Sequence, residues 1–184
     1  MGWALVVIDM QEGMADRIRA GREVAVPEAP ERMAALIGLF RERGLPVVHV
    51  LHDDSDPASP FRRDAPGGRP MAVTAPRAGE AVFWKSGSSA FAGTGLDAHL
   101  RRIGADRIVL TGAVAAFCVT SATRAASDLG FRVVLPRDAV LGFDLPAADG
   151  RRIGAATVLD VTLAVLGADF AQVVDSAEVA GLLG

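Results

Sequence analysis

Three side chains of different chemical types follow apolar, strand-like runs of the sequence. Asp9 comes directly after the first run, Lys85 ends the third, and Cys118, the only cysteine of the chain, follows the fourth. In an open α/β sheet, ligands bind where the carboxyl ends of the parallel strands meet. The sequence therefore predicts that an acid, a cation and a thiol converge at one edge of a sheet.

Together these three groups are suited to nucleophilic hydrolysis. A cysteine is reactive as the thiolate, which a helix N-terminus and a nearby lysine favour. The carboxylate of Asp9 can accept the thiol proton and later return it to a leaving amine. Each residue also has an alternative interpretation. Cys118 could be a small buried hydrophobe, Asp9 a helix cap or a ligand of a metal or a ribose, and Lys85 a surface residue. The coincidence of all three favours catalysis.

The elements that must position these side chains alternate along the chain. Apolar runs of strand length are separated by helical patterns, which is typical of parallel strands joined by crossover helices. The runs are almost continuously apolar, so both faces of the sheet should be covered. We therefore expect an α/β fold with a three-layer, doubly wound, mostly parallel sheet of about six strands in a Rossmann-like order. The predicted strands are residues 3–8, 46–51, 81–84, 107–111, 131–135 and 172–174.

Helices are predicted between these strands from apolar spacing and from terminal residues. Thr94 with Asp97, and Asp175 with Glu178, have the spacing of capping boxes. Residues 53–79, rich in Pro, Gly, Asp and Arg, form a loop whose length is typical of functional or mobile segments. The predicted helices are residues 30–43, 95–103, 119–129, about 150–166, and a short one after Asp175.

Composition limits the classes of protein to consider. The 184 residues are 51% hydrophobic, which suits one domain over residues 1–184 with a sizeable core. The formal net charge of −3 gives no basic surface for nucleic acid. The apolar start is too short for a signal or a membrane span, and a single cysteine is typical of a reducing cytoplasm.

The motifs around the three candidate residues resemble those of the isochorismatase-like cysteine hydrolases. That family includes nicotinamidases, N-carbamoylsarcosine amidohydrolase, streptothricin hydrolase and true isochorismatases. The order and spacing of the motifs match over nearly the whole chain. The matching segments are 6–11 (VVIDMQ), 49–53 (HVLHD), 59–61 (SPF), Lys85 with 89–94 (SAFAGT), Gly112, 118–119 (CV), 122–124 (ATR), 130–134 (GFRVV) and 137–139 (RDA).

The resemblance implies a role for each matching residue. Asp9 would be the acid/base, Lys85 the activating cation, and Cys118 the nucleophile. Members that cleave isochorismate characteristically lack the cysteine, so its presence implies hydrolysis of a C–N bond, in a carboxamide, cyclic amide or carbamoyl group, through a thioester. The resemblance also implies a cis peptide bond between Ala113 and Val114, with the Val114 and Cys118 amides as the oxyanion hole.

The substrate pocket is predicted from side chains near the strand ends. Ala115 and Ala116 stand where relatives often carry threonine and a polar or acidic residue, which disfavours a small, highly polar amide. Aromatic residues could form apolar walls, although they could equally be core. The candidate substrate-binding residues are Gln11, His52, Phe61, Trp84, Phe91, Phe117 and Phe143.

We expect no cofactor and no metal. The histidines near the second predicted strand, His49 and His52, do not reproduce the metal-binding pattern of nicotinamidases. The expected partner is a small-molecule amide, with neither nucleic acid nor membrane, and the resemblance implies a homodimer or homotetramer. A non-catalytic relative acting as an oligomeric scaffold or small-molecule binding protein is the alternative. A flavodoxin or receiver module fits less well, because Asp9 stands alone and no phosphate loop is present.

Overall fold

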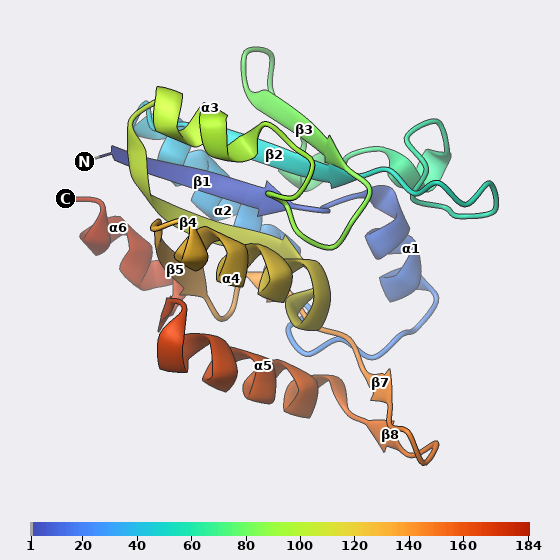
Figure 1. The fold of residues 1–184 in the computed structure, drawn as a ribbon. Coiled ribbons are helices and arrows are strands. Elements are labelled where there is room, and N and C mark those ends of the chain that lie inside the picture. Colours follow the sequence, from blue (N-terminus) through green and yellow to red (C-terminus); the bar gives the residue numbers. More distant parts are fainter. Residues whose placement is uncertain (1) are drawn as a thin grey trace.

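A parallel sheet forms the centre of the computed structural model, which describes residues 2–184 (Figure 1). Its strand order is β3–β2–β1–β4–β5–β9, with the short β6 (Val140–Leu141) pairing with β4 beyond the end of β5. This is the predicted doubly wound order, and all six predicted strands are confirmed. Their bounds are β1 (Gly2–Ile8), β2 (Val47–His52), β3 (Ala81–Lys85), β4 (Ala105–Ala113), β5 (Arg132–Pro136) and β9 (Gln172–Val174).

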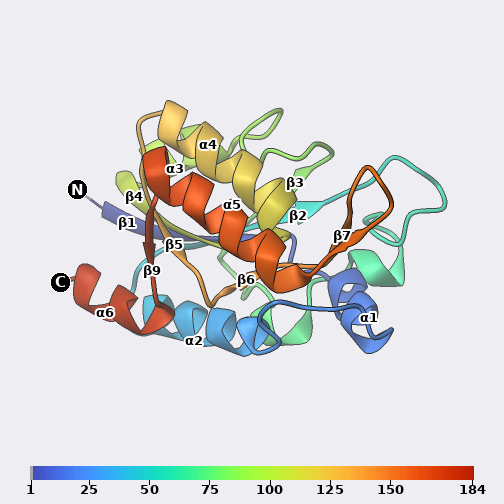
Figure 2. The ribbon, with the colours of Figure 1, turned by 90° about the horizontal axis from the view of Figure 1, so that it is seen from below.

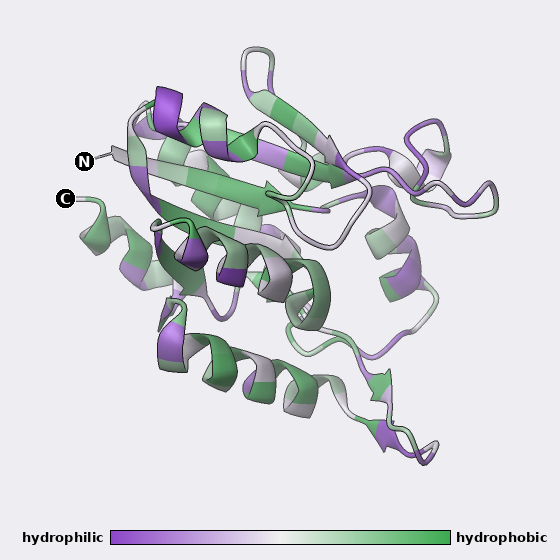
Figure 3. Cartoon of the chain, in the orientation of Figure 1, coloured by the Kyte–Doolittle hydropathy of each residue, from purple (hydrophilic) through white to green (hydrophobic). Residues whose placement is uncertain are grey.

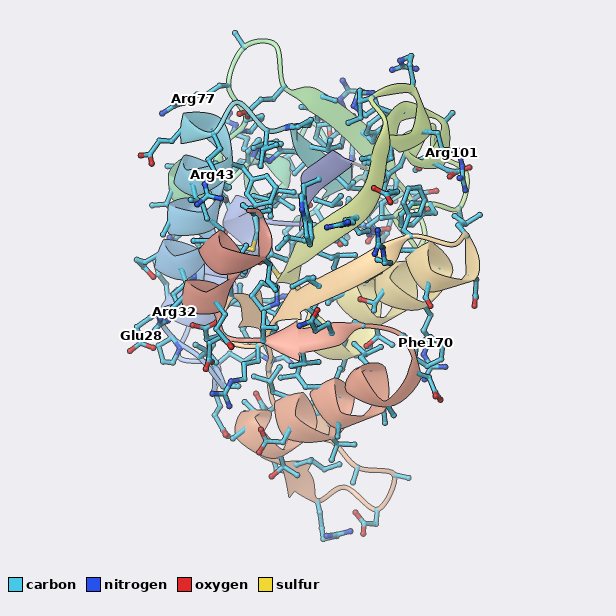
Figure 4. The ribbon with its side chains drawn as sticks, turned by 90° about the vertical axis from the view of Figure 1, so that its left-hand side faces the viewer. Glu28, Arg32, Arg43, Arg77, Arg101 and Phe170 are labelled. Atoms are coloured by element: carbon cyan, nitrogen blue, oxygen red, sulfur yellow. The ribbon has the colours of Figure 1, made fainter. Side chains whose placement is uncertain are left out.

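Helices cover both faces of this sheet and make the outer two layers (Figure 2). Figure 4 views the molecule from the side where the chain termini lie, with Arg32 of α2 and Arg43, directly after α2, on one side of the sheet and Arg101 and Phe170 on the other. The helices are α1 (Glu12–Arg19), α2 (Ala29–Glu42), α3 (Leu96–Arg102), α4 (Thr120–Asp128), α5 (Ala155–Asp169) and α6 (Val179–Leu182). None of them combines the length and the apolar character needed to cross a bilayer.

Alternating side chains of the strands fill two separate cores. On β1, Leu5 and Val7 are buried with α2, whereas Val6 and Ile8 are buried with α3, α4 and α5. Figure 3 shows the corresponding hydrophobic colour along the central strands. Burial on both faces explains why these strands read as continuous apolar runs.

One helix start and one capping interaction differ from the predictions. The predicted start of α5 near residue 150 is wrong, because Arg152–Ile153 forms a strand, β8, that pairs with β7 (Leu145–Pro146). The predicted capping box of Thr94 and Asp97 is also wrong, because Asp97 instead forms an ion pair with Arg101. The box of Asp175 and Glu178 is confirmed, and it opens the turn that leads into α6.

Residues that the sequence did not assign to a helix form α1, which packs against the loop after β2. That loop contains two 3-10 turns, Pro66–Gly68 and Ala72–Thr74. Figure 1 shows α1 and this loop together beyond the arrowheads of β1 and β2. Helix α1 and this loop therefore border the carboxyl edge of the sheet on one side.

A partly buried ion network ties Glu80, directly before β3, to β2 and α2. The Glu80 carboxylate accepts hydrogen bonds from Arg41 Nε at 2.7 Å and from the Arg77 amide at 2.7 Å. His49 Nε2 lies 3.1 Å from the same carboxylate, and burial lowers the pKa of that imidazole, so it is a neutral donor. Burial opposes the charge of Glu80, but the hydrogen bond from Arg41 and the other partners outweigh it and hold its pKa at about 2.

Replacing Glu80 by glutamine is expected to lower the free energy of unfolding at pH 7 by about 2 kcal/mol, typical of hydrogen bonds to a charged group. Because the folded pKa lies below the ordinary 4.5, the carboxylate stabilises the protein above pH 4.5, and this contribution is lost as the pH falls toward about 2. Urea unfolding at several pH values checks this, with the exposed Glu42→Gln as the control. An equal loss at pH 3 and pH 7 would contradict it.

Candidate active site

Asp9 takes its place through an unusual backbone conformation at the end of β1. Its φ of 52° lies in the left-handed region, which is unfavourable for a residue with a side chain. Its amide donates to the Val50 carbonyl at 2.8 Å, so the turn is fixed against β2. The side chain is 2% exposed, which is rare for a carboxylate.

Cys118 is brought to the same edge by a close contact between β4 and β1. Gly112 on β4 has a φ of 129°, and a Cβ there would lie 2.1 Å from the Ile8 carbonyl oxygen, so only glycine fits. The following Ala113–Val114 peptide bond is cis, and a π-helical turn, Ala115–Val119, then carries the partly buried Cys118 into α4. The cysteine thus sits at the strand-to-helix junction.

The ammonium group of Lys85 lies between the acid and the thiol. Its Nζ is 2.8 Å from Asp9 Oδ2 and 3.3 Å from Cys118 Sγ. It also lies 3.0 Å from the Gly87 carbonyl oxygen and 3.1 Å from His52 Nδ1. An ammonium has three hydrogens for these four acceptors, so its contacts must be shared.

His52 is an acceptor in this arrangement. Burial lowers the pKa of its imidazole, and the positive charge of Lys85 lowers it further. The neutral ring therefore accepts at Nδ1 and carries its proton on Nε2. Lys85 is held by this ring and by Gly87, which directs it toward Asp9 and Cys118.

Asp9 keeps one carboxylate oxygen without a partner. Oδ2 faces Lys85, whereas the buried Oδ1 has no hydrogen bond within residues 2–184. Burial raises the pKa of Asp9, and the attraction to Lys85 only partly offsets that effect. An unpartnered oxygen on a carboxylate with a raised pKa is suited to accept a proton.

The proton of Cys118 stays on sulfur at neutral pH. Burial raises the pKa of the thiol to about 11, and the charge of Asp9 raises it as well. Lys85 favours the thiolate, as the sequence analysis expected, but it does not outweigh these two effects. The site is thus a thiol beside a carboxylate, and proton transfer must accompany attack.

A cavity of about 360 Å³ opens over this group of residues. Of the predicted substrate-binding residues, it includes His52, Phe61 and Phe117, the last with 50% of its surface exposed. Its volume lies at the small end of ligand pockets. The full lining is Asp9, Met14, Arg17, Arg22, His52, Asp54, Phe61, Val114, Phe117, Cys118 and Leu145.

Gln11 lies behind the cavity rather than in its wall. It is fully buried, and its Nε2 donates to the His52 and Gly68 carbonyl oxygens, both at 2.9 Å. Its Oε1 accepts from the His52 amide at 2.9 Å. These bonds hold the backbone of His52 and of the loop, and Gln11 is not among the residues that line the cavity, so its predicted contact with substrate stays a prediction.

Three predicted aromatic residues also lie outside the cavity lining. Phe91 is buried against Phe131, with ring centroids 5.9 Å apart. Trp84 lies under the guanidinium of Arg63, and Phe143 is 2% exposed beneath Arg22. A strand end can direct a side chain to either face of a sheet, so their sequence positions alone did not exclude packing roles.

The residues that α1 and the turn after it bring to the cavity were not predicted from the sequence. Met14, Arg17 and Arg22 line it, although they lie in a segment for which no helix was predicted. The four-residue spacing of Met14 and Ile18 was the available signal of this helix.

Two further observations bear on other kinds of site. A larger hollow of about 620 Å³ lies among Trp3, Phe131 and Phe170, and it includes none of Asp9, Lys85 and Cys118. Within residues 2–184, no three side chains of histidine, cysteine, aspartate or glutamate are grouped so that they could hold a metal ion.

Comparisons with known proteins agree with the fold. Residues 3–162 match the isochorismatase domain family model. Streptothricin hydrolase of Streptomyces noursei is 36% identical over 79% of this chain, which spans 51% of that relative. Maleamate amidohydrolase of Pseudomonas putida is 31% identical over 74% of this chain and 71% of its own. A crystal structure of an isochorismatase-family protein from Chromobacterium violaceum has a TM-score of 0.93 at 36% identity, covering 100% of this chain and 94% of the other.

Proposed function

The chain belongs to the isochorismatase family, and on that basis we propose that it hydrolyses a C–N bond of a small carboxamide, cyclic amide or carbamoyl compound through a thioester on Cys118. Relatives named streptothricin hydrolase, maleamate amidohydrolase and N-carbamoylsarcosine amidase support this class of reaction. The observation that carries the proposal is the position of Lys85 Nζ, which contacts both Asp9 and Cys118 beneath the cavity.

The first half of the reaction forms the acyl-enzyme. Asp9 takes the proton of Cys118 on its unpartnered Oδ1 as the sulfur attacks the carbonyl carbon. The tetrahedral intermediate collapses when its C–N bond breaks and Asp9 returns the proton to the leaving nitrogen. Ammonia or an amine departs from a carboxamide or carbamoyl compound, whereas the freed amine of a cyclic amide stays attached to the acyl group. In each case the acyl group remains on Sγ.

The second half releases the acid. Asp9 removes a proton from water, whose oxygen attacks the thioester carbon, and the C–S bond breaks. The proton then returns from Asp9 to sulfur, which restores the thiol. No co-reactant besides water is consumed.

Lys85 and two backbone amides stabilise the charges that develop. The ammonium lies close enough to Asp9 and Sγ to stabilise negative charge on either as the proton moves. We assign the oxyanion to the amides of Val114 and Cys118, at the turn where the chain enters α4. His52 and Gly87 keep Lys85 in place.

The proposal predicts Cys118-dependent release of ammonia or amine from at least one class in a panel of amides. The panel contains nicotinamide, N-carbamoyl amino acids, aryl amides and the cyclic amide streptothricin, with Cys118→Ser as the blank. For streptothricin, whose freed amine stays attached to the product, the readout is the ring-opened amino acid instead of a released amine. Turnover that is absent in the blank supports the proposal. No turnover of any class, together with a Cys118 that iodoacetamide fails to alkylate even at pH 10, would contradict it and favour a non-catalytic binding protein.

A further inference from the structure

An arginine without an anionic partner lies in the wall of the catalytic cavity. Arg17 and Cys118 line the same cavity. Within residues 2–184, no carboxylate forms an ion pair with Arg17, whereas Arg19 on the same helix pairs with Asp16 and Glu12. The contacts of the Arg17 guanidinium are a weak one to the Met14 sulfur at 3.8 Å and the face of the Phe61 ring, 4.7 Å away.

The contact with Phe61 places the Arg17 guanidinium over an aromatic ring, which takes up none of its N–H groups in a conventional hydrogen bond. Phe61 is 7% exposed, so the ring is a firm support. A guanidinium in such a contact keeps N–H groups available for a planar carboxylate, which it can bind through two parallel hydrogen bonds. The position therefore resembles a prepared anion site rather than a surface charge.

A second guanidinium adds to the positive charge of this wall. Arg22 lines the same cavity and donates to the Asp144 carbonyl at 2.9 Å, with its Nε 3.4 Å from Asp144 Oδ1. The other oxygen of Asp144 accepts from Arg152 at 2.6 Å. One carboxylate thus faces two guanidiniums, and Arg17 has none. Burial lowers the pKa of Arg17, and the nearby charge of Arg22 lowers it too, so a bound anion would relieve an unfavourable arrangement.

Within residues 2–184, neither acid of the cavity lining, Asp9 or Asp54, forms an ion pair with Arg17 or Arg22. Asp54 accepts a hydrogen bond from the Asp56 amide at 3.1 Å, and its charge acts on His52. The cavity is therefore lined by the thiol of Cys118, by an apolar wall of Phe61 and Phe117, and by a positive wall of Arg17 and Arg22.

We propose that Arg17, with Arg22 beside it, binds a carboxylate carried by the substrate. This inference rests on the proposed function and narrows its substrates to small amides that bear an anionic group. The cavity of about 360 Å³ suits a short acid amide, in which a few atoms separate the scissile carbonyl from the carboxylate. The positive charge of Arg17 and Arg22 thus favours an anionic substrate, whereas Ala115 and Ala116 had led us to expect that a small, highly polar amide is disfavoured.

The test measures how well small amides protect Cys118 from alkylation by iodoacetamide. The probes are succinamate, glutaramate and adipamate, each compared with its uncharged methyl ester. In the wild-type protein, the best acid should protect at a concentration at least about tenfold lower than its ester, as a hydrogen-bonded charge would give. Arg17→Met should remove most of this preference, and Arg17→Lys, which keeps the charge but not the paired donors, should retain part of it.

Arg19→Met is the matched control, since it removes an equal charge from the same helix and should keep the full preference. Equal protection by acid and ester in the wild-type protein, or a preference that survives in Arg17→Met, would overturn the anion site. Ammonia release in the same samples separates the two proposals. If the acids protect Cys118 selectively but no sample releases ammonia, the anion site is supported and the amidase is contradicted. If acid and ester release ammonia at equal rates, the amidase is supported and the anion site is contradicted.

Discussion

Replacing Cys118 by alanine is expected to reduce kcat/KM for the hydrolysed amide by at least about 10⁴-fold, the scale seen when a catalytic nucleophile is removed. Without Sγ, Asp9 and Lys85 have no nucleophile to activate, and the acyl-enzyme cannot form. The side chain is small and partly exposed, so the fold should persist. Initial rates of ammonia release check the first expectation, and the melting temperature checks the second.

A Cys118→Ala variant that keeps a tenth or more of the wild-type rate would show that water is activated without a covalent step. A variant that loses both activity and its cooperative melting transition would be uninformative about catalysis. For that case Cys118→Ser serves as the second variant, because it retains the volume and hydrogen-bonding capacity of the side chain while weakening the nucleophile.

Replacing Asp9 by asparagine should have opposite effects on turnover and on thiol reactivity. Turnover should fall by about 10²- to 10⁴-fold, because the site loses the group that moves the proton. In the wild-type protein, burial and, second, the charge of Asp9 raise the pKa of the Cys118 thiol to about 11. The substitution removes the charge of Asp9 but not the burial, so the thiol pKa should fall and alkylation of Cys118 by iodoacetamide at pH 7 should become faster.

The alkylation rate measured between pH 6 and pH 11 gives the thiol pKa in each protein directly. In the wild-type protein, the rate should rise with pH up to about 11, whereas in Asp9→Asn the rise should end at lower pH. The exposed Asp16→Asn removes the same charge from α1 and is the control. Equal pH profiles in all three proteins would show that Asp9 is not coupled to the thiol.

The sheet and the three central residues could be predicted because both depend on strong local patterns. Strands buried on both faces are continuously apolar, and parallel strands place their carboxyl ends together, so Asp9, Lys85 and Cys118 had to lie near one another. The contacts of Lys85 with Asp9 and Cys118 follow from this topology.

The cavity wall could not be predicted equally well, because it depends on the direction of individual side chains. Phe117 and Phe91 are both aromatic residues near strand ends, yet the first is 50% exposed and the second 9%. Gln11 follows Asp9 by two residues, but it turns to the backbone of His52. Arg17 was missed because α1 is a short helix with a weak apolar pattern, formed against a loop that is distant in sequence.

Partitioning of the acyl group between water and hydroxylamine tests the thioester most directly. Hydroxylamine added to the enzyme and its amide should divert the acyl group to a hydroxamate in proportion to its concentration, and Cys118→Ala should form none. Formation of the acid alone at every hydroxylamine concentration, with undiminished ammonia release, would contradict a covalent intermediate on Cys118.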